Sequence, residues 1–136
     1  MSDTNTQDKE SSAPGSIGWT DLTVADAPAV RDFYEQVVGW QPVDVEMGGY
    51  QDYCMREPST GRNVAGVCHA RGVNKHLPPV WLIYIRVADL EESLRKCVEL
   101  GGRVLAEPAA LGPGARHGVI ADPAGAICAV YEQALA

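Results

Sequence analysis

The chain has 136 residues, the size of one domain and enough to build a sizeable hydrophobic core. Its formal net charge is −7 and its aromatic content is 7%, so nucleic acids and anionic membranes are not expected as partners. No apolar run approaches the roughly 20 residues of a membrane helix, and no secretory signal precedes the four widely spaced cysteines. We therefore predict a soluble, cytoplasmic protein with reduced thiols. A single domain over residues 16–136 is expected to follow a disordered tail, residues 1–15.

One stretch of the chain repeats at a constant distance. An offset of 63 residues takes residues 17–42 to residues 80–105, and at this offset four identical residues align: Val24 with Val87, Ala25 with Ala88, Asp26 with Asp89 and Gly39 with Gly102. Both copies have the pattern of an apolar strand, a helix-capping aspartate, about three helical turns, a glycine stop and a second strand. The sequence thus predicts two copies of one module, over about residues 17–70 and 80–133.

The first module is predicted to contain one helix and four strands. Alternation over residues 17–24 puts Trp19, Asp21 and Thr23 on one face of a strand. A helix follows from the capping Asp26 to the stop at Gly39. Its apolar stripe comprises Val30, Phe33, Tyr34, Val37 and Val38. Strands over residues 40–47, 50–56 and 64–70, the last two joined by a turn at residues 57–61, complete a βαβββ unit.

The second module repeats this plan after a connector at residues 71–79. Its first strand puts Leu82, Tyr84 and Arg86 on one face. Asp89 and Glu92 resemble a capping box, and the buried stripe of the helix is predicted to be Leu90, Leu94, Cys97 and Val98. A strand over residues 103–106 leads to a loop over residues 107–118, which is predicted to be a lid because loops of this length are commonly functional. Strands at residues 119–121 and 126–132 flank a tight turn.

Several motifs recur in a characteristic order along the chain. They are Trp19-Thr-Asp-Leu-Thr-Val-x-Asp, Phe33-Tyr34, Gly39-Trp40, Trp81-x-x-Tyr84-x-x-Val87-x-Asp89, Gly101-Gly102-Arg103-Val104 and Ala121-Asp122-Pro123-x-Gly125-Ala126. Over about residues 17–133 this order resembles the glyoxalase, bleomycin-resistance and extradiol-dioxygenase superfamily, also called vicinal oxygen chelate, and within it the small glyoxalase-like proteins. The resemblance implies an α+β fold in which two βαβββ modules form curved mixed sheets around a shared cleft, with the helices outside.

In that superfamily a divalent metal is held by four residues, one on the first and one on the last strand of each module. The matching positions, seven residues before each capping aspartate and four after each turn glycine, are occupied by Trp19, Leu82, Ala65 and Ala129. Divalent cations need imidazole, carboxylate or thiolate donors, which none of these side chains offers. The neighbours of Ala65 offer no donor either. The sequence therefore predicts no metal, and no other cofactor is expected.

Histidine and cysteine side chains are the remaining candidates for chemistry. His69 shares a face with Ala65 and Val67, from which it could look into the mouth of the cleft and form a relocated metal or acid–base pair with Asp21. The alternative is a strand-end histidine partly in solvent. Cys68 points to the opposite face, which favours a place in the core. His76 and His117 fall on a connector and a loop.

The residues predicted to bind a ligand form a mixed apolar and polar set: Trp19, Asp21, Thr23, His69, Leu82, Tyr84, Arg86 and Arg116. An apolar wall with a few convergent polar groups is typical of a small-molecule pocket. An ion pair between Asp21 and Arg86, or a hydrogen bond of Tyr84, would instead only hold the modules together. Both interpretations stay open at the level of sequence.

We therefore predict a metal-free protein that binds a small, partly aromatic or amphipathic molecule, and the residues at the four metal positions favour a binding protein over an enzyme. It is expected to form a homodimer, either with modules paired within a chain or with modules exchanged between chains. One alternative is a metal-dependent lyase, isomerase or dioxygenase with non-standard ligands. Another is a structural or interaction protein with a filled cleft.

Overall fold

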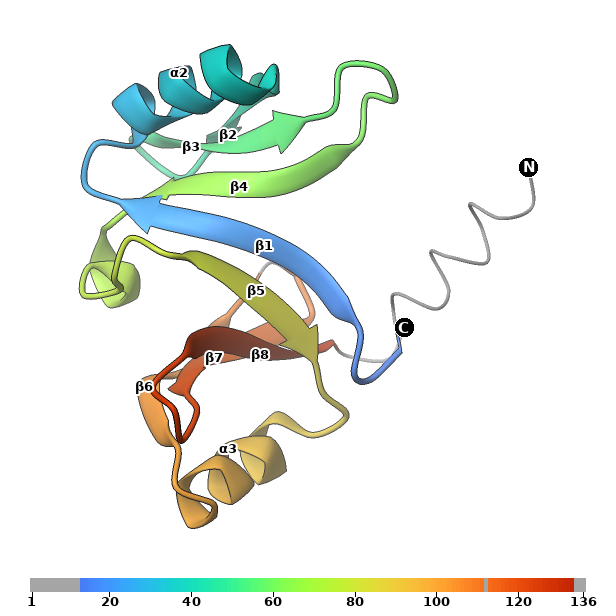
Figure 1. The fold of residues 1–136 in the computed structure, drawn as a ribbon, viewed down its shortest axis with the longest axis vertical. Coiled ribbons are helices and arrows are strands. Elements are labelled where there is room, and N and C mark those ends of the chain that lie inside the picture. The colour runs from blue at the N-terminus through green and yellow to red at the C-terminus, as the bar shows by residue number, and fades with distance from the viewer. Residues whose placement is uncertain (1–12, 112, 134–136) are drawn as a thin grey trace. The chain divides into compact units, whose positions relative to one another are not determined.

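The computed structural model describes residues 13–111 and 113–133 (Figure 1). In chain order its elements are β1 (Ile17–Val24), α2 (Ala27–Val38), β2 (Gln41–Glu46), β3 (Gln51–Arg56), β4 (Asn63–His69), the 3-10 turn η1 (Gly72–Asn74), β5 (Trp81–Arg86), α3 (Leu90–Glu99), β6 (Arg103–Ala110), β7 (Ala115–Ala121) and β8 (Ile127–Gln133). The described chain divides into two compact units: residues 19–81 form the first, and residues 82–111 and 113–133 form the second together with residues 13–18. Each unit is described in turn.

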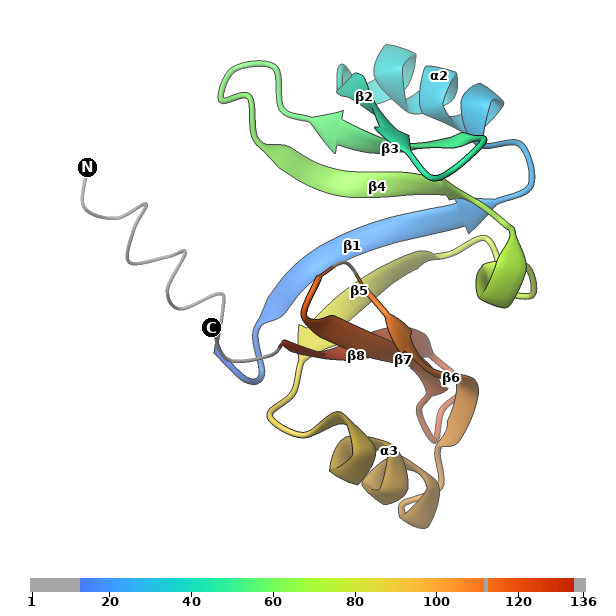
Figure 2. The ribbon, with the colours of Figure 1, turned by 180° about the vertical axis from the view of Figure 1, so that it is seen from behind.

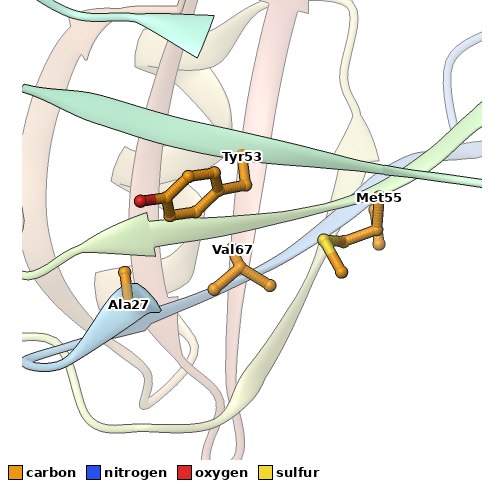
Figure 3. Packing of buried hydrophobic residues seen from close by; sticks show 5 residues of the cluster. Ala27, Tyr53, Met55 and Val67 are labelled. Atoms are coloured by element: carbon orange, nitrogen blue, oxygen red, sulfur yellow. The ribbon is translucent and has the colours of Figure 1, made fainter. Parts of the chain in front are cut away.

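The first unit is a four-stranded mixed sheet with α2 on one face. Its strand order is β2-β3-β4-β1, in which β1 runs parallel to β4 and the other pairs are antiparallel. Buried residues of α2, β3 and β4 form its core: Ala27, Tyr53, Met55, Ala65 and Val67 (Figure 3). Val24, Val30, Tyr34, Trp40 and Trp81 pack against this cluster. The indole nitrogen of Trp81 donates a hydrogen bond to the Tyr34 hydroxyl at 3.1 Å, which ties the end of the unit to α2.

Local signals at the two ends of α2 account for its bounds. The Asp26 carboxylate accepts a hydrogen bond from the Ala29 backbone N–H at 3.2 Å. Gly39 ends the helix with a φ of 79°, in the left-handed region that favours glycine. The predicted apolar stripe is too wide, since Phe33, Val37 and Val38 are more than half exposed. Only the narrower stripe through Ala27, Val30 and Tyr34 faces the sheet, because a single sheet can bury only one side of a helix.

The second unit repeats the arrangement with the order β5-β8-β7-β6, and α3 lies on one face. The Asp89 carboxylate accepts a hydrogen bond from the Glu92 backbone N–H at 3.1 Å, so both predicted caps are confirmed. Leu90 and Leu94 pack against Val130 in the core of this unit, and Ile85, Val87, Val104 and Ile120 surround them. The prediction that Val98 is buried is wrong. This side chain is 59% exposed, because Val98 lies beside the face of the helix that packs on the sheet and not on it.

The predicted loop over residues 107–118 is also wrong. β6 continues to Ala110 and pairs with β7 in an antiparallel ladder, side by side in Figure 2. Two register shifts between Val104 and Ala109 let β6 pass Pro108, which lacks a backbone donor. A short turn that includes Gly114, at a φ of 73°, reverses the chain, and the Leu111 N–H donates to the Ala115 carbonyl at 2.9 Å. Proline and glycine therefore mark a bulge and a turn here, and no lid.

The fold class is α+β with two βαβββ modules in one chain, as predicted. Residues 1–12 of the predicted tail lie outside the described residues, whereas residues 13–16 form a turn. This turn leads into the second unit, where the Gly15 N–H donates to the Arg86 carbonyl at 2.7 Å and the Arg86 N–H to the Ser16 carbonyl at 2.9 Å. The described helices are all too short or too polar to cross a membrane. The shared cleft concerns both units together and stays a prediction.

Candidate functional site

The face of the first unit opposite α2 carries Trp19, Asp21 and Thr23, which share a side of β1 as the alternation predicts. Asp21 pairs in register with Gly66 and Thr23 with Cys68, so these β4 residues lie on the same face. A Cβ at Gly66 would lie 3.0 Å from the Asp21 Cβ and 3.5 Å from the indole nitrogen of Trp19. Glycine therefore leaves room for the Trp19 ring on this face. Asp21 and Thr23 are both buried.

The faces predicted for β4 are reversed. Ala65 and Val67 point into the α2 core, and Cys68, which was expected in the core, lies on the face of Asp21 and Thr23. The reason is a register shift between Met55 and Arg56 in the β3–β4 ladder, which absorbs the extra residue of this hairpin. The residue of β4 beside Trp19 and Asp21 is Gly66. Like Ala65, it offers no metal ligand.

The Cys68 thiol is held in its neutral form by its surroundings. Burial raises the pKa of this thiol far above its ordinary value, and the carboxylates of Asp21 and Asp52 act in the same direction. Burial also raises the pKa of Cys54, the neighbour of Gly66 in the ladder. A protonated thiol is a poor nucleophile and a poor metal ligand. These cysteines therefore add a small apolar surface to the face and no reactive group.

His69 lies on the α2 side and is paired with Asp52, so the predicted pair with Asp21 is wrong. Its Nδ1 is 3.2 Å from the Asp52 carboxylate, which also accepts the His69 backbone N–H at 2.9 Å. The imidazole packs edge-on to Tyr50, with the ring centroids 5.5 Å apart, and the Arg71 guanidinium covers Tyr50 at 3.8 Å. Register explains the outcome, because His69 pairs with Val24, whose side chain joins the α2 core. His69 therefore belongs to an aromatic and charged cluster at the end of β4.

The face of the second unit opposite α3 holds the other predicted residues. Tyr84 pairs in register with Ala129, and Arg86 with Tyr131. Leu82 lies two residues before Tyr84 on β5, so its side chain is on the same face. Across the β7–β8 ladder, Ala129 and Tyr131 pair with Val119 and His117. Leu82, Tyr84, Val119 and Ala129 are each less than 5% exposed. The face is thus mainly apolar and aromatic, with Arg86, His117 and the tyrosine hydroxyls as its polar groups.

His117 is the residue of this face that sequence reasoning missed. It lies in the middle of β7, is 6% exposed and stacks obliquely on Tyr84 with the ring centroids 5.7 Å apart. Burial lowers the pKa of the imidazole, and a backbone hydrogen bond at Ala109 opposes this shift. The alternation of His117, Val119 and Ala121 in the sequence could have predicted a strand with these three side chains on one face. Gly118 and the glycines before it led to the wrong prediction of a loop.

Arg116 points to the other side of β7. It pairs in register with Glu132, whose carboxylate accepts the Leu90 backbone N–H at 2.7 Å at the start of α3. Its guanidinium forms a salt bridge with Glu91 of α3, and this hydrogen-bonded partner raises the pKa of Arg116. Arg116 therefore braces α3 against β7 and lies apart from the face of Tyr84 and His117.

The superfamily's metal does not fit the residues found at the corresponding places. Trp19 and Gly66 share one face of the first unit, and Leu82 and Ala129 share one face of the second. None of the four carries a donor for a divalent cation. Over residues 13–111 and 113–133, no three histidine, cysteine or acidic side chains are grouped so that they could hold a metal ion.

A hollow of about 270 Å³ opens on the α3 side of the second unit. It is lined by Ser93, Lys96, Cys97, Leu100, Gly102, Ile120, Asp122, Pro123 and Val130. None of the predicted ligand-binding residues lines it. The hollow therefore lies on the opposite side of the sheet from the face of Tyr84 and His117.

Comparison with known proteins places the chain in a family. Residues 16–129 match the model of the Glyoxalase/Bleomycin resistance protein/Dioxygenase superfamily. The chain belongs to this superfamily. It is 37% identical over 119 residues to the anthracycline biosynthesis protein DnrV of Streptomyces peucetius, and 34% identical to the anthracycline biosynthesis protein DauV of another Streptomyces. In both cases the match covers 88% of this chain and 42% of the relative, so the chain spans less than half the length of these relatives.

Two solved structures share the fold. A methylmalonyl-CoA epimerase from Streptomyces coelicolor, in complex with 2-nitronate-propionyl-CoA, superposes with a TM-score of 0.56 at 19% identity, covering 90% of this chain and 100% of that one. The methylmalonyl-CoA epimerase from Mycobacterium tuberculosis gives a TM-score of 0.51 at 21% identity, with 85% and 86% of the two chains covered. At this level of identity the similarity concerns the fold alone.

Proposed function

We propose that this protein binds a small, partly aromatic or amphipathic molecule without a metal, at the sheet faces opposite the helices. The observation that carries the proposal is the make-up of these faces. Aromatic and apolar side chains surround a few polar groups there, and the four places that hold the superfamily's metal offer no donor. Such a combination is typical of a site that retains a ligand by burial and a small number of hydrogen bonds.

The relatives support an aromatic ligand over other classes. DnrV and DauV are named as proteins of anthracycline biosynthesis, and we carry an aromatic ligand over to this chain by analogy. Trp19, Tyr84, Tyr131 and His117 supply ring surfaces on the two faces. Ring stacking and burial of apolar area would provide most of the affinity for such a molecule.

Tyr84 and Arg86 are proposed as the main polar contacts in the second unit, with Asp21 and Thr23 in the first. If they bind the ligand, Tyr84→Phe and Arg86→Ala should weaken binding by about 1 to 3 kcal/mol, through lost hydrogen bonds or an unpaired partner. Binding of 2-naphthol, a two-ring aromatic alcohol, can be followed by titration calorimetry on each variant. Arg62→Ala removes an exposed arginine outside these faces and is the matched control.

The competing interpretation is that these polar groups only stabilise the fold. In that case Tyr84→Phe and Arg86→Ala should lower the melting temperature and leave the affinity for 2-naphthol unchanged. Measuring both quantities on both variants separates the two interpretations. Unaltered affinity in both variants would exclude Tyr84 and Arg86 from the ligand site.

A metal-dependent lyase, isomerase or dioxygenase is the second candidate, favoured by the superfamily to which the chain belongs. Elemental analysis of the purified protein tests it directly. The metal-free proposal expects no stoichiometric zinc, nickel, manganese or iron. Close to one tightly held metal per chain, removed by a chelator with loss of an activity, would favour the enzyme instead.

We further propose that the protein is a cytoplasmic homodimer. The strands β2 and β6 are the outer strands of their units and present unpaired backbone groups that need covering. Two-fold dimers are the commonest closed oligomers, and a partner copy is one way to cover such edges. Light scattering at tens of micromolar is expected to give twice the chain mass of 14.6 kDa. A mass of one chain would contradict the dimer and would leave the fold unaffected.

A further inference from the structure

His117 lies in a row of side chains that crosses the second unit. In register, Arg86 of β5 pairs with Tyr131 of β8, Tyr131 with His117 of β7, and His117 with Ala109 of β6. Tyr84 lies two residues before Arg86 on β5, and its ring packs on the His117 imidazole with an interplanar angle of 40°. The imidazole is therefore held in place by its neighbours on an aromatic face.

The Nδ1 atom of this imidazole is buried and has no hydrogen-bond partner among the described residues. Buried polar atoms in native proteins are nearly always paired, so an unpaired one calls for a partner, which a bound molecule can supply. The hydroxyl of Tyr131, the register partner of His117 on β8, does not supply this bond. The Tyr131 hydroxyl oxygen is directed to Gly18, where even a single Cβ would overlap it.

The chemistry of the ring defines what that partner must be. Burial lowers the pKa of this imidazole and so favours its neutral form. A neutral imidazole has one N–H group and one nitrogen with a free lone pair, and we assign the lone pair to the unpartnered Nδ1. An acceptor binds hydroxyl or N–H groups and repels carboxylates and phosphates.

We propose that His117 anchors the ligand, its Nδ1 accepting a hydrogen bond from a phenolic or enolic hydroxyl group of the bound molecule. This inference rests on the proposed function and deepens it, because it names neutral hydroxylated aromatics as the ligand class. Tyr84 provides the ring surface beside the anchor. His117 is thus a binding and specificity-determining residue, with no role in a chemical step.

A cycle of two ligands and two proteins tests the inference. The ligands are 2-naphthol and 2-methoxynaphthalene, which have the same ring system and differ in the hydroxyl donor. The proteins are the wild type and His117→Phe, which keeps a ring against Tyr84 and removes the acceptor. Wild type is expected to bind 2-naphthol about tenfold more tightly than the methyl ether, and His117→Phe to lose this preference. His76→Phe, at an exposed histidine on the connector, should behave as wild type.

The outcomes separate this inference from the proposed function. If wild type binds both naphthalenes equally, or if His117→Phe still prefers 2-naphthol, the proposed role of His117 is wrong and the proposed binding function is unaffected. If wild type binds neither compound, both are wrong. Nitrogen-15 NMR of the wild-type side chain gives a second readout that needs no variant. Adding 2-naphthol should shift the Nδ1 signal of His117, and an unmoved signal in the bound state would overturn the proposal.

Discussion

Two glycines determine how closely side chains and backbone approach one another in these units. At Gly66 the absent Cβ leaves space for the Trp19 ring beside Asp21. At Gly102 a Cβ would lie 2.6 Å from the Cys97 Sγ and 2.8 Å from the Ala121 carbonyl oxygen, so the end of α3 can pass directly over β7. At both positions the fold requires glycine, because a Cβ atom would come too close to neighbouring atoms.

Gly102→Ala is expected to destabilise the protein by about 1 to 3 kcal/mol, because the new methyl group overlaps both a sulfur atom and a backbone carbonyl. Equilibrium denaturation by urea measures the change in unfolding free energy. Combining it with Cys97→Ala should recover only part of the loss, since the Ala121 carbonyl stays in place. Full recovery in the double variant would show that the sulfur atom alone limits the space.

His117 also gives the stability of the protein a pH dependence of known sign. Its pKa is lowered below the ordinary 6.5, so the unfolded chain takes up a proton at a higher pH than the folded one. The neutral His117 imidazole contributes fully to the unfolding free energy above about pH 6.5. This contribution is lost as the pH falls from there through the pKa that His117 has in the folded protein. Wild type should therefore lose more unfolding free energy than His117→Phe between pH 7.5 and pH 5. Equal losses in the two proteins would contradict the burial of a neutral imidazole.

Sequence reasoning predicted part of this candidate site. Alternation placed Trp19, Asp21 and Thr23 on one face and Leu82, Tyr84 and Arg86 on another, because β1 and β5 are regular strands. It failed at Ala65 and His69, where a register shift between β3 and β4 exchanges the faces of β4. A shift of this kind depends on the partner strand, so the residues of β4 alone do not reveal it.

At the scale of elements, the ends of the two helices follow from local chemistry. Asp26 and Asp89 each accept a backbone N–H three residues later, and Gly39 takes the left-handed conformation that ends α2. These signals act within one turn, which is why the sequence predicted them correctly. The ladder between β6 and β7 depends on contacts between residues distant in the sequence, and one of its two register shifts spans Pro108, so the residues of β6 alone do not reveal it.

The helix caps lend themselves to a direct test. Asp26→Ala is expected to lower the unfolding free energy by about 0.5 to 2 kcal/mol, since the Ala29 N–H loses its acceptor. Chemical denaturation followed by far-UV circular dichroism measures the loss. Gln36→Ala, on the exposed side of the same helix, should change the stability by less than about 0.5 kcal/mol and serves as the control. Equal effects of the two substitutions would show that the cap contributes nothing.

At the scale of the whole molecule, this chain keeps the superfamily's α+β architecture and lacks its metal ligands. Residues 16–129 match the superfamily, yet Trp19, Gly66, Leu82 and Ala129 stand where donors would be needed. A fold can retain a binding face after the residues for one chemistry are lost, because function resides in the site and not in the architecture.

The dependence of ligand binding on metal tests the central claim most directly. Titration calorimetry with 2-naphthol would be carried out on protein treated with excess EDTA, and again after dialysis and addition of zinc or nickel. A metal-free site predicts the same dissociation constant within about twofold under all three conditions, because no ligand contact passes through a cation. Loss of binding after EDTA treatment, with recovery when zinc or nickel is added, would contradict the account.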